Sequence, residues 1–162
     1  MASIQASPEL INNPEAFAKF QAAQGDVALI NFAPPIALAL QQSGKSDEAV
    51  RLLAAAESAV SARYAQANRT VRAQLNTDFA RIYAVQGRRS DALARLSASV
   101  QAGWIPDPPA ILTDLALDPP LALLKGEPRF EQSRQKVFDF VKQERAELGP
   151  FRLAGSPAKS LP

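Results

Sequence analysis

Histidine and cysteine are both absent from this chain of 162 residues. Without histidine the chain lacks the commonest general base and the commonest protein ligand for metals, and without cysteine it has neither disulfides nor thiolates. The two absences exclude the serine and cysteine triads that depend on histidine, whereas enzymes that use only carboxylates stay compatible with the composition. We therefore expect a protein that is not an enzyme and that uses no metal or other cofactor.

Long apolar runs are lacking as well. The longest, from Val27 to Leu40, is broken by Asn31 and by Pro34-Pro35, whereas a membrane-spanning helix needs about 20 apolar residues. The first residues lack the basic and apolar regions of a signal peptide. We expect no membrane insertion by this chain and a cytoplasmic location, with a periplasmic one left open if the chain comes from a membrane-anchored protein.

Glycine is scarce and alternating runs of β-branched residues are missing, whereas alanine and leucine are abundant. This balance favours helices over strands. With 47% hydrophobic residues, a chain of this length can bury the core of one domain. The sequence predicts an all-α protein with a single domain over residues 1–149 and a disordered tail over 150–162, which is rich in proline and serine.

Two segments of the chain align with each other without a gap. They read IALALQQSGKSDEAVRLLAAA from Ile36 and FARIYAVQGRRSDALARLSAS from Phe79. In both, alanines and large apolar residues recur at helical spacing, and a glycine follows the first helix. The matched positions are Ile36/Phe79, Ala37/Ala80, Leu40/Tyr83, Gly44/Gly87, Ala49/Ala92 and Leu53/Leu96. The pattern predicts two helical hairpins, repeat one over 33–61 and repeat two over 73–104, whose alanines let paired helices approach closely.

Capping residues, prolines and glycines place the ends of the expected helices. Asparagine or aspartate followed by proline is typical of a helix start, and glycine of a helix end. Because Pro34 and Pro35 lack backbone donors, we expect the chain to kink there or a helix to restart. The expected helices span 14–24, 34–43, 46–66, 71–86, 90–102, 119–125 and 128–148. The first and the last of them would cap the two ends of the stack.

The matched positions are those of tetratricopeptide repeats (TPR), and both hairpins resemble that family, although neither has its consensus tryptophan or closing proline. Residues 73–148 resemble the C-terminal part of such arrays in many bacterial regulatory proteins, in which residues 105–149 would form the closing segment and capping helix. Gly103-Trp104, Asp118-Pro119 and Pro128-Arg129-Phe130 carry that likeness. The resemblance implies a short superhelix that serves as a protein–protein interaction or regulatory module. It also implies an alternative, a sensor or effector-binding domain of a larger bacterial signalling protein.

In tetratricopeptide arrays the first helices of successive repeats line a concave face, and the resemblance assigns that face to two sets of positions. They are Asn31, Leu38, Gln41 and Gln42 in repeat one, and Gln74, Thr77, Arg81 and Val85 in repeat two. This mostly uncharged lining is expected to bind another protein or a peptide. For Arg81, an ion pair with Asp78 one turn earlier is the competing interpretation.

Two aromatic residues are further candidate anchors for a partner, Trp104 and Phe140. We expect Trp104 to be largely buried where residues 103–130 fold back onto the last helix. Phe140 falls off the apolar stripe of that helix, so it is either a surface residue or a contact with a partner. A third alternative is a structural subunit that forms an oligomer with copies of itself.

Arginines concentrate in the middle of the chain and spread over two or three helices, with only Tyr64, Phe79 and Tyr83 as aromatic residues in the same stretch. This layout is more typical of a solvated helix surface than of a nucleic-acid footprint, so we expect no nucleic-acid partner, while an acidic protein partner stays open. The rival from another class is a carboxylate-only enzyme, for which Asp107, Asp114 and Asp118 are the acids with a chance of converging. The central arginines are Arg51, Arg63, Arg69, Arg72, Arg81, Arg88, Arg89 and Arg95.

Overall fold

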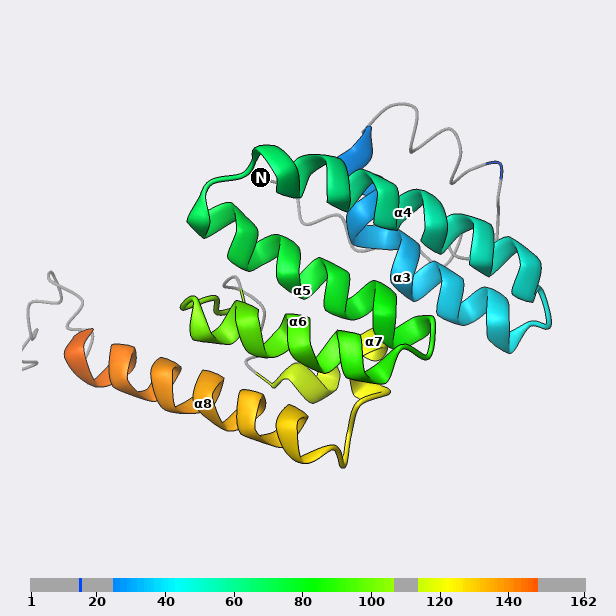
Figure 1. Ribbon diagram of the computed structural model, residues 1–162. Coiled ribbons are helices and arrows are strands. Elements are labelled where there is room, and N and C mark those ends of the chain that lie inside the picture. Colours follow the sequence, from blue (N-terminus) through cyan, green and yellow to red (C-terminus); the bar gives the residue numbers. More distant parts are fainter. Residues whose placement is uncertain (1–14, 16–24, 107–113, 149–162) are drawn as a thin grey trace, which may run out of the picture.

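The computed structural model describes residue 15, residues 25–106 and residues 114–148. In this part of the chain the regular secondary structure is helical and no strand occurs, so the all-α prediction is confirmed (Figure 1). The expected helix over 14–24, apart from the helical Glu15, lies outside the described residues, as do Asp107 and the tail over 150–162. None of the described helices is both long and apolar enough to span a membrane.

The elements follow one another as two hairpins and a closing segment (Figure 1). The first hairpin consists of α3 (Asp26–Gln42) and α4 (Ser46–Gln66), and the second of α5 (Arg69–Val85) and α6 (Arg89–Gln101). The closing segment contains the 3-10 helix η1 (Leu115–Leu117), the short helix α7 (Pro119–Ala122) and the long helix α8 (Pro128–Leu148). The bounds of α4 and α8 agree with the prediction, whereas α7 is shorter than expected.

The predicted restart of a helix at Pro34 is wrong, because α3 runs through both prolines. Each proline removes a backbone donor, and an internal proline costs a helix about 3 kcal/mol. Burial opposes this cost, since Pro34 itself lies in the core together with neighbours such as Ala33 and Ile36. Tertiary packing therefore holds a helix that local propensity disfavours.

The two hairpins turn in the same way, and the end of α6 repeats that turn. Gly44, Gly87 and Gly103 each take a positive φ, of 77°, 76° and 86°, which only glycine adopts readily. The residue after each glycine donates its N–H to the carbonyl five residues earlier, as in a Schellman motif. These bonds join Lys45 to Leu40 (2.9 Å), Arg88 to Tyr83 (2.9 Å) and Trp104 to Ser99 (3.1 Å).

The matched alanines of the internal repeat lie where helices touch. Ala37, Ala49, Ala80 and Ala92 have no exposed surface at all. Around them the two hairpins and the closing segment share one apolar core. α5 is central to it, because this helix contacts α3, α4, α6 and α7 (Figure 1). The expected burial of these positions is confirmed, while the superhelical arrangement of tetratricopeptide repeats stays a prediction.

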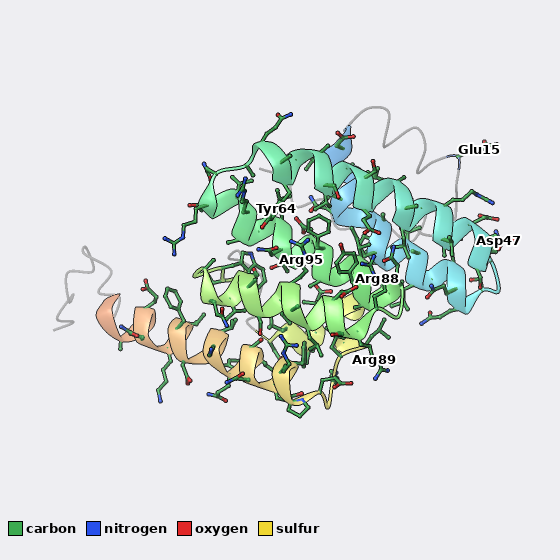
Figure 2. The ribbon with its side chains drawn as sticks, viewed as in Figure 1. Glu15, Asp47, Tyr64, Arg88, Arg89 and Arg95 are labelled. Carbon is green, nitrogen blue, oxygen red and sulfur yellow. The ribbon has the colours of Figure 1, made fainter. Side chains whose placement is uncertain are left out.

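Arginines of the second hairpin contact aromatic rings and a carboxylate of the same chain. The Arg95 guanidinium lies 4.3 Å from the ring centre of Phe79 and 5.4 Å from that of Tyr64 (Figure 2). Arg88 lies 3.9 Å from the ring centre of Tyr83 and donates to Glu57 at 3.1 Å. Such contacts use the arginines to cover aromatic surface, which agrees with the interpretation of the basic stretch as a helix surface.

Candidate functional site

An open groove lies between α3, α5 and the closing segment, with a volume of about 360 Å³. Most of its wall is apolar and comes from the closing segment. The apolar part includes Pro35, Trp104, Leu115, Leu117, Pro119 and Pro120, and the polar part Asn31, Arg81, Asp114 and Asp118. The wall of the groove thus combines residues of α3 and α5, the first helices of the two hairpins, with residues that lie far from them in the sequence.

Two aspartates shape the part of the wall that the closing segment supplies. Asp114 caps η1, accepting from the backbone N–H of Ala116 at 2.9 Å, and Asp118 caps α7, accepting from the N–H of Leu121 at 3.5 Å. Aspartate is favoured at such positions because its oxygens satisfy the free donors at a helix start. Leu117, the last residue of η1, is 54% exposed and lines the groove.

Arg81 is the charged centre of the groove wall. Its guanidinium contacts Asp118 at 2.7 Å and Asp78 at 3.3 Å, so it pairs with Asp78 as the competing interpretation proposed, and with a second carboxylate as well. Burial disfavours the charge on Arg81, but the two carboxylates outweigh this effect and raise the pKa of the guanidinium. Arg81 is therefore committed to partners within the chain.

A row of hydrogen bonds connects Arg81 to the tryptophan. The Trp104 indole N–H donates to the amide oxygen of Gln74, and the Gln74 amide donates to Asp78 at 3.5 Å. The Asp78 side chain is only 4% exposed. Burial raises the pKa of Asp78, and Arg81 and Gln74 offset part of that rise. Trp104, Gln74, Asp78, Arg81 and Asp118 thus form a connected polar row across α5.

Asp114 is held as a carboxylate by the last helix. Arg134 of α8 binds it with two hydrogen bonds, at 2.6 and 2.7 Å, a bidentate geometry that favours the charged form. The Arg134 side chain holds the pKa of Asp114 below its usual range. Each of the two acids that line the groove, Asp114 and Asp118, therefore pairs with an arginine and caps the start of a helix.

The structure brings only part of the predicted concave lining together. Asn31 and Arg81 line the groove, and Gln74 lies beside it through its bond to Trp104. Thr77 is fully buried and shares a 2.7 Å hydrogen bond with Ser99, and Val85 is buried too, so neither is accessible to a partner.

The rest of that lining belongs to the far end of α3. Leu38, Gln41 and Gln42 do not line the groove. Gln41 donates to the carbonyl of Val85 at 3.2 Å and so joins the two hairpins, while Gln42 is exposed. The predicted helix began at Pro34, whereas α3 begins at Asp26. Its groove-lining residues, Asn31 and Pro35, lie nearer the start of the helix than Leu38, Gln41 and Gln42 do.

The two candidate aromatic anchors differ in position. Trp104 lines the groove and is partly buried against the core, and its indole N–H bonds to α5 rather than to the last helix, where we expected the ring to pack. Its indole N–H finds a partner on α5, which holds the ring there. Phe140 is 39% exposed on α8 and does not line the groove. Sequence reasoning missed Pro35 and Leu117 as lining residues, and only Leu117 had a local signal, the Asp118-Pro119 helix start that follows it.

Comparison of the chain with family models, with curated proteins and with solved structures finds no match. The likeness to tetratricopeptide repeats therefore rests on the sequence positions themselves. In the described part of the chain, no three acidic side chains are placed to hold a metal ion together. The candidate site is defined by its shape and by its paired charges.

Replacement of Asp114 by asparagine should make the free energy of unfolding less dependent on pH in the acidic range. The lowered pKa of Asp114 means that the unfolded chain binds this proton more readily, so the ion pair stabilises the fold above the ordinary aspartate pKa and is lost as the pH falls through the folded value. Urea unfolding should therefore find the variant less stable at pH 7, with a difference that shrinks below about pH 4.

The exposed Asp139, on the same helix as Arg134, provides the control. For Asp139→Asn, the difference from wild type in the free energy of unfolding should not shrink as the pH falls. A difference between Asp114→Asn and wild type that stays constant between pH 7 and pH 3 would contradict the assigned role of the Asp114–Arg134 pair.

Proposed function

We propose that this protein is a non-catalytic interaction module of the tetratricopeptide type, which binds an uncharged, apolar segment of another protein in the groove. The observation that carries the proposal is an accessible apolar wall whose charged neighbours are already paired within the chain. Leu117, Trp104 and Pro119 offer apolar surface. Arg81 is neutralised by its two carboxylates. Affinity would therefore come from apolar burial rather than from ion pairs.

The backbone of α3 supports an extended partner segment. Pro35 has no N–H, so the carbonyl of Asn31 lacks the donor that an α-helix normally supplies four residues later. Asn31 and Pro35 both line the groove. A peptide N–H from a partner is the natural donor for such a carbonyl, and main-chain hydrogen bonds of this kind are common in peptide recognition.

The same groove argues against the carboxylate-only enzyme. A glycosidase-like mechanism needs one carboxyl group whose pKa is raised so that it can donate a proton. The pKa of Asp114 is instead lowered by Arg134, and Asp118 is bound to Arg81 at 2.7 Å. Both acids are therefore better suited to hold the wall of the groove than to exchange protons with a substrate.

A displayed random-peptide library tests the proposal. Binders selected on the full chain should be rich in aromatic and aliphatic residues, and Leu117→Asp should weaken them about tenfold or more, because it places a charge in the apolar wall. Leu123, which is 39% exposed in the same segment but does not line the groove, gives the matched control. Equal weakening by Leu117→Asp and Leu123→Asp, or failure to select any peptide, would contradict the proposed site.

A further inference from the structure

A second cavity, of about 260 Å³, lies between α3, α4 and α5. It adjoins the groove at Asn31, which lines both. Val27, Ile30, Val71 and Leu75 form its apolar part, and Asn31, Arg63, Gln74 and Asp78 its polar part. Sites for drug-sized ligands measure roughly 300–1,000 Å³, so this cavity suits a smaller molecule.

The ion pairs of Arg81 alone do not balance the carboxylates beside the cavity. Asp78 and Asp118 share the single guanidinium of Arg81, so this group of three carries one excess negative charge when both acids are ionised. Asp78, the member that lines the cavity, is almost completely buried. A buried carboxylate whose charge is only partly compensated is costly, and a cation from a ligand would relieve that cost.

One oxygen of Asp78 is available for such a cation. Within the described part of the chain, both hydrogen bonds to Asp78 use Oδ1, at 3.5 Å from Gln74 and 3.3 Å from Arg81. None of them uses Oδ2. An acceptor at the wall of a cavity that lacks a donor among the described residues is suited to an ammonium group from a ligand.

Arg63 adds a positive charge to the same cavity. Its side chain lies on an exposed part of α4 and lines the cavity together with Asp78. The charge of Arg63 also contributes to lowering the pKa of Asp78, although burial outweighs it. A simple amine would be attracted by Asp78 but repelled by Arg63, whereas a ligand with both charges would satisfy both residues.

The geometry points to a binding site for a free α-amino acid with an aliphatic side chain. Its ammonium group would donate to Oδ2 of Asp78 and its carboxylate would accept from Arg63, while its side chain would lie against Val27, Val71 and Leu75. This site shares only Asn31 with the lining of the proposed partner groove, and its assignment does not depend on peptide binding there. It matches the alternative implied by the sequence, an effector-binding domain of a signalling protein.

Isothermal titration of the full chain with L-leucine is the test. We expect saturable binding that falls about tenfold or more in Asp78→Asn and in Arg63→Gln, since each variant removes one charged partner. Arg69→Gln is the matched control, because Arg69 is exposed and does not line this cavity. N-acetyl-leucine, which lacks the ammonium group, and isoamylamine, which lacks the carboxylate, should each bind about tenfold more weakly than leucine.

Three outcomes would overturn the assignment. They are absence of saturable heat with leucine, unchanged leucine binding in Asp78→Asn or Arg63→Gln, and isoamylamine binding as tightly as leucine. If Asp78→Asn fails to fold, which circular dichroism would show, Arg63→Gln and the ligand series still decide the matter, because Arg63 is an exposed residue. Peptide binding in the groove, read separately through Leu117→Asp, is not required for any of these outcomes.

Discussion

Replacement of Phe130 by alanine is expected to destabilise the protein by about 3–5 kcal/mol, the usual cost of truncating a fully buried aromatic residue. Phe130 has no exposed surface and is the largest of the completely buried side chains in the described part of the chain. It lies in the first turn of α8 and belongs to the core that also contains Leu121 and Leu124 of the closing segment and Leu96 of α6. Its removal would leave a cavity where the closing segment meets the second hairpin.

Urea unfolding, followed by circular dichroism, measures this effect. The control is Phe140→Ala, which removes the same side chain from the same helix at a position that is 39% exposed. A substitution at such a surface site usually changes the free energy of unfolding by about 0.5 kcal/mol or less. If both variants unfold at the same urea concentration, the closing segment is not packed on the hairpins as described.

The sequence carried most of the information about the helices, because their signals are local. Ser46 follows the Gly44 turn and Pro128 sits at a helix start, and α4 and α8 both begin and end where the pattern predicts. The continuity of α3 was not predictable in this way. Two prolines argue against a helix locally, and only the burial of Pro34 among residues from other helices explains why the helix continues.

The candidate site was harder to predict than the fold, because it depends on contacts between distant residues. Position in a first helix suggested an accessible lining, yet Thr77 turned out to face α6, where it meets Ser99. The apolar wall comes instead from the closing segment. Its place is fixed by Arg81 with Asp118 and by Arg134 with Asp114, which are separated by 37 and 20 residues. Helical periodicity gives no information on pairs at such separations.

Leucine in place of Ala92 is expected to cost about 1–3 kcal/mol, because the larger side chain would force apart helices that are already in contact. Ala92 has no exposed surface, and it lies on α6, which packs along α5. The same holds for Ala49 on α4, its counterpart in the first hairpin. We therefore expect Ala49→Leu and Ala92→Leu to lower the stability by similar amounts, measured as the free energy of unfolding in urea.

Ala94→Leu isolates the packing effect, because Ala94 lies on the same helix as Ala92 but is exposed. Alanine and leucine have nearly the same helix propensity, so the control changes the side chain without changing the preference for a helix. Ala94→Leu should leave the stability within about 0.5 kcal/mol of wild type. A loss for Ala94→Leu as large as that for Ala92→Leu would show that the two alanines do not differ in packing. In that case the alignment of the two hairpins would give the wrong register, since it assigns Ala92 and not Ala94 to the contact between helices.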